Sequence, residues 1–204
     1  MIFIYNYKNS FKNYDEAKYP YGMEFIKESK YDNFHGECTE EGFNIMAGGS
    51  KHLFATPALE NFDIKMKVSI SHYRAPFRNL VFAVLAGFDK KTQKGYDIEF
   101  KYEYNEKIFS ISIVESIGLK KTVLLTKKYE DTDIKYHTPT PLKVSVSDGK
   151  VQGSFGKYSF DFDFVIPRGR VGIDVSYVSY GIIFSDAVIT SSETFAKKKI
   201  FFIL

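Results

Sequence analysis

The stretch from Lys94 to Tyr104 alternates between apolar and charged residues. The apolar set is Tyr96, Ile98, Phe100, Tyr102 and Tyr104, and the charged set is Asp97, Glu99, Lys101 and Glu103. Successive side chains of a β-strand point to opposite sides, so this period of two predicts a strand with one face in a core. The chain must therefore contain a sheet whose other face carries three carboxylates and a lysine in a row.

Strand signatures recur along most of the chain. We expect strands at residues 61–72, 80–88, 96–104, 107–115, 122–128, 142–147, 150–155, 158–164, 169–175 and 181–190. Asp148-Gly149 lies between two of them and is a strong hairpin signal, because glycine tolerates the positive φ of a type I′ turn. Short helices are expected only at 14–18 or 23–30. Many short strands with almost no helix predict an all-β fold, an antiparallel sandwich or barrel.

Length and charge narrow the classes of protein. A chain of 204 residues fits one large β domain, and we expect a single domain over residues 1–204 with its core at about 40–190. There are 28 basic and 25 acidic residues, and Lys197, Lys198 and Lys199 account for the whole excess. The balanced body argues against a nucleic-acid groove, which needs a clustered basic surface.

The two ends and the single cysteine bear on compartment and assembly. Cys38 is the only cysteine, which favours a reducing compartment, and residues 1–7 do not resemble a signal peptide, so we expect the cytoplasm. No apolar run is long enough to cross a bilayer, and we expect no membrane partner. The apolar tail 200–204 would promote aggregation if exposed. We therefore expect terminal strands 1–7 and 198–204 to pair at a sheet edge, or to serve self-association or docking.

Several segments in residues 40–190 resemble, in order, the strands of the concanavalin A-like lectin/glucanase superfamily. They are 41–46 with 52–56 (an early hairpin), 61–68 (the first long core strand), 95–100 (a central strand of the concave sheet), 141–149 (a pair ending in a tight turn), and 169–173 with 183–189 (the closing strands). The resemblance implies an antiparallel two-sheet jelly-roll sandwich. It also implies a carbohydrate-binding or accessory domain of a glycoside-active protein, with an oligo- or polysaccharide held by the concave sheet or its rim loops.

The carboxylates of the alternating strand are the first candidate site. Residues two apart on a strand lie about 6.5–7 Å apart on one face, a spacing at which two carboxyl groups can flank a glycosidic bond. Glucanases of the superfamily carry Glu-x-Asp-x-(x)-Glu on such a strand, whereas this chain has Asp97-x-Glu99-x-Lys101-x-Glu103. Three interpretations stay open: a solvated face with charges paired across strands, ligand binding by Asp97 and Glu99, or catalysis by Asp97, Glu99 and Glu103 as a glycoside hydrolase.

Two loops are the other candidates. Segment 71–78 supplies His72, Tyr73, Arg74 and Arg78, whose guanidinium groups and aromatic faces suit sugar hydroxyls and sugar CH faces. The turn 176–181 adds Tyr177 and Tyr180 as stacking platforms. Both segments could equally be surface loops that pack on their own domain.

Metal and cofactor signals are weak. His35, His52, His72 and His137 show no paired ligand spacing, so no metal site is predicted. The acidic stretch 130–133 could offer oxygen ligands to calcium, but a solvated loop explains it better, and no cofactor is expected. A structural or interaction domain with no sugar ligand remains the third functional hypothesis.

Overall fold

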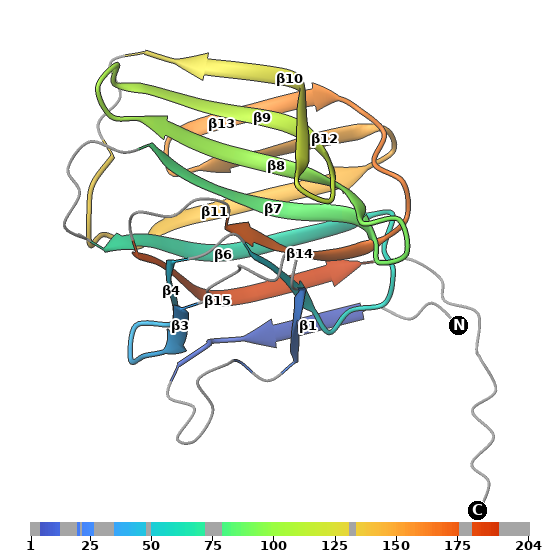
Figure 1. Ribbon diagram of the computed structural model, residues 1–204, viewed down its shortest axis with the longest axis horizontal. Coiled ribbons are helices and arrows are strands. Elements are labelled where there is room, and N and C mark those ends of the chain that lie inside the picture. The colour runs from blue at the N-terminus through green and yellow to red at the C-terminus, as the bar shows by residue number, and fades with distance from the viewer. Residues whose placement is uncertain are drawn as a thin grey trace, which may run out of the picture.

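Two antiparallel sheets make up the fold (Figure 1). The computed structural model describes residues 5–12, 20, 22–26, 35–47, 50–71, 79–130, 134–175 and 181–191. The larger sheet is built from β1 (Tyr5–Asn9), β3 (His35–Cys38), β4 (Phe43–Ala47), β6 (Phe62–Ser71), β11 (Thr140–Ser147), β12 (Lys150–Phe155), β13 (Tyr158–Asp163) and β15 (Gly181–Ser191). Its order is β13-β12-β11-β6-β15-β4-β3, with β1 also paired to β15.

The second sheet has seven strands and contains the alternating strand. It is built from β2 (Met23–Ile26), β5 (Ser50–Phe54), β7 (Leu80–Asp89), β8 (Lys94–Glu103), β9 (Ile108–Ile117), β10 (Lys120–Tyr129) and β14 (Arg170–Val175). Its order is β10-β9-β8-β7-β14-β5-β2, so β8 lies inside the sheet and β10 and β2 form its edges. The predicted all-β, two-sheet antiparallel class is confirmed.

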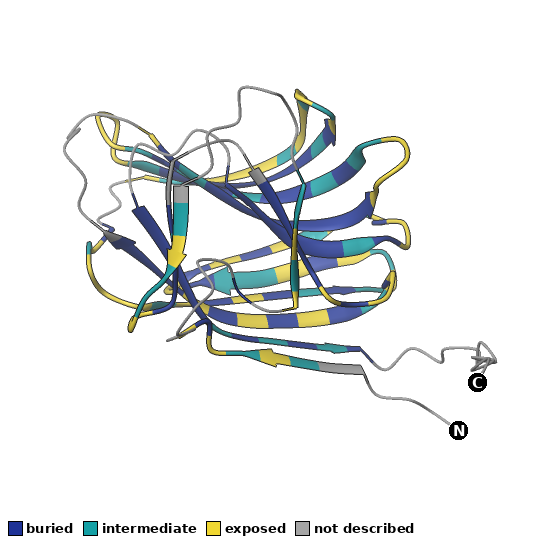
Figure 2. Cartoon of the chain, turned by 60° about the horizontal axis from the view of Figure 1, so that its bottom comes forward, coloured by how far each residue is buried: buried dark blue, intermediate teal, exposed yellow. Residues whose placement is uncertain are grey.

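The core lies between the sheets and is rich in phenylalanine. Phe82 of β7 stacks on Phe100 of β8, with ring centroids 5.1 Å apart, and meets Phe155 and Phe184 of the other sheet edge-on. The predicted inward set of the strand holds for Ile98, Phe100 and Tyr102, which are buried, and for Tyr96, which packs half-buried against the core. It is wrong for Tyr104, which lies beyond the end of β8 and is exposed. Figure 2 shows the same alternation of buried and exposed residues along the strands of the sandwich. Within the described ranges, no helix is long and apolar enough to span a bilayer.

The Asp148-Gly149 turn forms as predicted. It joins β11 to β12, which pair from Ser147 with Lys150 onward. Both turn residues have positive φ, 48° at Asp148 and 78° at Gly149. That is the backbone of a type I′ turn, whose twist matches the twist of the strands it joins.

Two expectations for the first third of the chain are wrong. Residues 23–26 form strand β2 and no helix, because Phe25 and its neighbours pair with β5; residues 14–18 and 27–30 lie outside the described ranges. The expected early hairpin does not form either, since β4 pairs with β15 in one sheet and β5 with β14 and β2 in the other. The chain therefore passes from the larger sheet at β4 to the seven-stranded sheet at β5. The two strands bury their apolar side chains in the core from opposite sheets.

The expected pairing of the two chain ends concerns mostly residues 1–4 and 192–204, which lie outside the described ranges. What the structure does describe is β1 running antiparallel to β15, from Tyr5 opposite Ser191 to Asn9 opposite Ala187. The amino-terminal strand is therefore part of the larger sheet.

Candidate functional site

The charged row of β8 points away from the core, onto the outer face of the seven-stranded sheet. Residues paired across neighbouring strands share a face. Asp97 pairs with Leu85 and Val114, and Glu99 pairs with Ala83 and Ser112. The face around these carboxylates is therefore made by β7, β8 and β9, with β14 and β5 beyond β7.

The β9–β10 hairpin folds over this face. The register of β10 against β9 shifts between Val123 and Leu125, so Leu124 is an extra residue, and such a bulge bends its strand. Figure 1 shows the start of β10 crossing in front of β9 and β8. Lys121 from this crossing segment places its Nζ 3.0 Å from Oδ2 of Asp97 on β8 and 3.0 Å from Oδ2 of Asp174 on β14.

Four charged side chains meet beneath the hairpin: Lys51, Asp97, Lys121 and Asp174, here called the charge cluster. Lys51 on β5 lies directly opposite Asp174 on β14, with its Nζ 4.0 Å from Asp174 Oδ2. The side chains of Lys51, Asp97 and Asp174 are 0% exposed, and that of Lys121 is 27% exposed. Moving charges out of water costs several kcal/mol per ion, so such a cluster persists only when every charge has a close partner.

Burial sets the protonation of the cluster. It raises the pKa of Asp97 to about 8, with a further push from the Asp174 carboxylate and only partial relief from Lys121 and Lys51. Asp97 therefore carries a proton at neutral pH, and its Oδ1 has no hydrogen-bond partner in the described part of the chain. Burial acts to lower the pKa of Lys121, but the charges of Asp174 and Asp97 outweigh it and raise the pKa. Lys121 thus stays an ammonium ion.

Glu99 differs from its neighbours because it is half-buried without a partner. Across the described ranges its carboxyl makes no ion pair and no hydrogen bond. Burial raises its pKa, and the charge of Lys121 only partly offsets this. Beside it, the hydroxyls of Ser112 and Thr126 lie 2.9 Å apart. Glu99 therefore offers an open acceptor or donor to a ligand on this face.

The structure gives different outcomes for the individual residues of the predicted site. The interpretation of the row as a solvated face is wrong for Asp97, which has no exposed surface because Lys121 covers it. Glu103 is engaged by Lys101, whose hydrogen bond holds the pKa of Glu103 below its ordinary value. The remaining predicted residues, His72, Tyr73, Arg74, Arg78, Tyr177 and Tyr180, lie outside the described ranges.

Sequence reasoning missed Lys51, Lys121 and Asp174. Each comes from a different strand, and only the fold brings them to Asp97. A signal existed for Asp174, which interrupts an otherwise apolar strand (Val171–Val175), where a charge is unexpected unless it is paired. Lys51 is followed in the chain by His52. Burial lowers the pKa of His52 to about 3, so this histidine is neutral and is part of the core.

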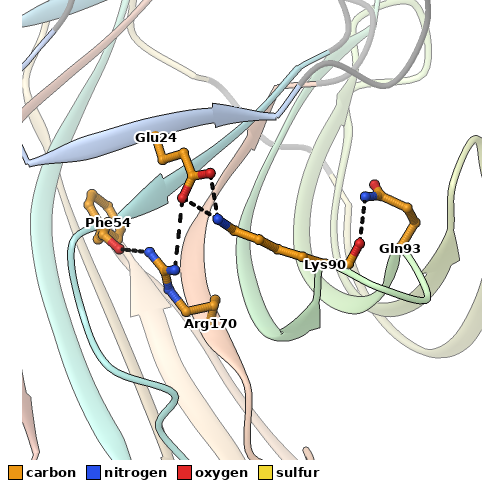
Figure 3. Close-up of polar contacts among 5 residues, drawn as sticks. All are labelled: Glu24, Phe54, Lys90, Gln93 and Arg170. Carbon is orange, nitrogen blue, oxygen red and sulfur yellow. Dashed lines mark hydrogen bonds and ion pairs between the residues drawn. The ribbon is translucent and has the colours of Figure 1, made fainter.

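Two further ion pairs, both made by Glu24, link strands of the same sheet near its β2 edge (Figure 3). Glu24 of β2 pairs with Lys90 of the β7–β8 turn and, at 3.8 Å, with Arg170 of β14. Arg170 also donates a hydrogen bond to the carbonyl of Phe54 at 2.9 Å. These contacts link β2, β5, β14 and the β7–β8 turn.

The opposite sheet carries a shallow hollow. It measures about 360 Å³ and is lined by polar side chains that include Asp63, Lys65, Lys143 and Gln152. No aromatic ring lines it except that of Phe160, which belongs to the core. Among the described residues, no group of His, Cys, Asp or Glu side chains is placed to hold a metal ion. The outer face of the seven-stranded sheet is the better candidate for a ligand site, because the half-buried carboxyl of Glu99 makes no ion pair and no hydrogen bond there within the described ranges.

Comparisons with known proteins identify the fold. No protein-family model matches the chain, and no curated protein matches it in sequence. Among solved structures it is similar to the carbohydrate binding module CBM66 from Bacillus subtilis, with a TM-score of 0.62 and 16% identity over 83% of this chain and 96% of that one. The exoplasmic/lumenal domain of VIP36, in its Ca²⁺/Man3GlcNAc-bound form, matches with a TM-score of 0.57 and 11% identity over 87% and 86%.

A legume lectin-like domain from Entamoeba histolytica is also similar, with a TM-score of 0.58 and 14% identity over 82% of this chain and 89% of that one. At these identities the likeness concerns the fold alone. The predicted concanavalin A-like sandwich is thereby confirmed.

Proposed function

We propose that this chain is a non-catalytic carbohydrate-binding domain that holds an oligo- or polysaccharide on the outer face of the seven-stranded sheet. The observation that carries the proposal is Glu99, a half-buried carboxyl with a raised pKa and no partner among the described residues. A desolvated carboxyl gains most from a ligand that supplies hydrogen bonds, and sugar hydroxyls do so.

The surroundings of Glu99 support a hydroxyl-rich ligand. Ser112 and Thr126 add hydroxyls, Lys101 adds a cation, and Ala83 leaves room beside the carboxyl. Three proteins of similar fold are described as a carbohydrate binding module, a sugar-bound lumenal domain and a lectin-like domain, and these descriptions favour the same class of ligand. The rim residues His72, Tyr73, Arg74, Arg78, Tyr177 and Tyr180 stay predicted contacts.

A glycan array followed by calorimetry on any hit tests the proposal. We expect Glu99→Ala to weaken binding by at least about tenfold, since it removes a charge-assisted hydrogen bond. Asp63→Ala is the matched control, because Asp63 is an exposed acid on the opposite sheet, and its affinity should equal that of wild type. An array without hits, or equal affinities for all three proteins, would sink the proposal.

A glycoside hydrolase is the second candidate, and one observation favours it. The raised pKa of Glu99 is what a general acid needs near neutral pH. Its predicted partners fit less well, because Asp97 is covered by Lys121 and Glu103 is paired with Lys101. Turnover of β-glucan and aryl-glycoside panels by wild type and its loss in Glu99→Gln would establish this function in place of simple binding; no turnover removes it.

A further inference from the structure

The side chains of Lys51 and Asp174 lie close enough together for a covalent cross-link to form between them. They lie directly opposite one another on the neighbouring antiparallel strands β5 and β14. Both side chains are 0% exposed, and Lys51 Nζ lies 4.0 Å from Asp174 Oδ2. Directly opposed residues keep their Cβ atoms within about 5.5 Å, so the two strands hold amine and carboxyl together without any search.

We propose that Lys51 and Asp174 condense into an intramolecular isopeptide bond that ties β5 to β14. The Lys51 Nζ forms a bond to Cγ of Asp174, and one water molecule leaves. The step changes no oxidation state, so it needs neither an oxidant nor a co-reactant. The cross-link would join an early strand to a late one and close a loop of roughly 120 residues, a length at which loop closure constrains the unfolded chain strongly.

Asp97 supplies the proton transfers that this step requires. Lys51 first passes a proton to the carboxylate of Asp174, which leaves a neutral amine and a carboxylic acid, and the amine lone pair then attacks Cγ. Asp97 gives its proton to the departing hydroxyl of Asp174, which leaves as water, and the Asp97 carboxylate takes back the second proton from the new C–N nitrogen. Asp97 can do both because it lies on the same Lys121 ammonium as Asp174 and because its pKa, raised to about 8, keeps a proton available.

Lys121 is nearer to Asp174 than Lys51 is, but it has a different role. The charges of Asp174 and Asp97 raise its pKa, so it remains protonated and has no lone pair for attack. Its ammonium, 3.0 Å from Asp174 Oδ2, instead stabilises the negative oxygen that forms when the amine adds to Cγ. The cluster therefore contains a nucleophile, an electrophile, a proton carrier and a stabilising cation.

Burial favours condensation over a lasting ion pair. Water normally keeps a lysine and an aspartate apart as hydrated ions, and an exposed pair gains nothing by reacting. Within the cluster both side chains are 0% exposed, and replacing two buried charges by a neutral amide relieves their desolvation cost. The chain contains a matched exposed case, since Lys67 Nζ lies 3.0 Å from Asp186 Oδ2 with side chains 53% and 42% exposed.

Intact mass spectrometry of the purified full chain tests the proposal. After incubation at neutral pH, wild type should be one water (about 18 Da) lighter than its sequence mass, while Lys51→Arg and Asp174→Ala keep their full masses. Asp97→Asn should slow the mass loss by roughly 100-fold, the usual effect of losing a proton-transfer group. Lys67→Arg should lose water just as wild type does.

Peptide mapping by tandem mass spectrometry then assigns the bond. A peptide pair joined through Lys51 and Asp174 is the expected result for folded wild type, and it should persist in urea because the bond is covalent. This measurement decides the matter even where a variant fails to fold, since it is made on wild type alone. Folded wild type at full sequence mass overturns the proposal. So does a water loss that maps to a cyclised Asp148-Gly149 or to Lys121.

Discussion

At the scale of single residues, Lys121 holds the outer face of the seven-stranded sheet together. It contacts two carboxyl groups from strands that do not touch one another, since β7 separates β8 from β14. Removing one partner from a buried ion pair lowers the stability of the fold more than replacing both partners by apolar residues, because the remaining charge stays desolvated. The stability of this face therefore depends on a residue from the hairpin that covers it.

We predict that Lys121→Met lowers the free energy of unfolding by about 2–4 kcal/mol, somewhat less than for a fully buried partner because Lys121 is 27% exposed. Lys67→Met, which breaks the exposed pair with Asp186, should cost less than about 1 kcal/mol. Urea titrations of both variants measure the difference. Equal losses would mean that the cluster contributes no more than a surface ion pair.

The raised pKa of Asp97 gives a pH prediction. The folded chain keeps a proton on Asp97 that the unfolded chain releases above its ordinary pKa of 3.8, so stability is full below that pH and is lost as pH rises to about 8. His52, with its pKa lowered to about 3, acts in the opposite direction between pH 3 and 6.5. Between pH 6.5 and 8 only the loss from Asp97 should remain of these two, at about 1.4 kcal/mol per pH unit.

Unfolding free energies at pH 6.5 and 8 check this slope. Asp97→Asn cannot ionise, so its stability should change much less over the same interval. An equally steep decline in that variant would place the ionising group elsewhere, and a flat wild-type profile would mean that Asp97 titrates at its ordinary pH in the folded chain.

At the scale of elements, the sequence predicts strand β8 well, but it does not predict which residues cover the outer face of that strand. The alternation in β8 identifies Ile98 and Phe100 as core residues, and the structure agrees. What covers Asp97 depends on a hairpin whose bend arises from one extra residue, Leu124. Periodicity reports which face of a strand a residue occupies, but it carries no information about long-range contacts such as that of Lys121.

Deleting Leu124 tests the origin of the bend. Without the extra residue Val123 would still pair with Val114 and Lys121 with Ser116, but β10 would lose its bend, so the segment that carries Lys121 would no longer cross over Asp97. We predict that the deletion costs about as much stability as Lys121→Met, roughly 2–4 kcal/mol, and that combining the two changes adds little, because both remove the same ion pairs.

Leu124→Ala is the matched control for this deletion. It keeps the residue count and the bulge, and since Leu124 is 40% exposed it should cost less than about 1 kcal/mol. Thermal or urea unfolding of the three proteins provides the comparison. Full additivity of the deletion with Lys121→Met would show that the bulge and the charge cluster are independent.

At the scale of the whole molecule, one phenylalanine cluster connects the two sheets. Phe82 contacts Phe100 in its own sheet and Phe155 and Phe184 in the other. The chain has 20 phenylalanines and no tryptophan, but the partners of Phe82 follow from the placement of β12 and β15 in the sheet opposite β7 and β8, which no local sequence pattern predicts. The expectation of a single domain remains a prediction, and the cluster makes it testable.

If the sheets share one core, they must unfold together. Phe82→Ala should then lower the free energy of unfolding by about 3–5 kcal/mol, and Phe82→Leu by clearly less, because leucine fills most of the cavity. Far-UV circular dichroism reports both sheets, and tyrosine fluorescence, undisturbed by tryptophan, reports side-chain packing. Both probes should give one coincident transition in wild type and in each variant. Separate transitions, with only one shifted by Phe82→Ala, would mean that the sheets are independent folding units.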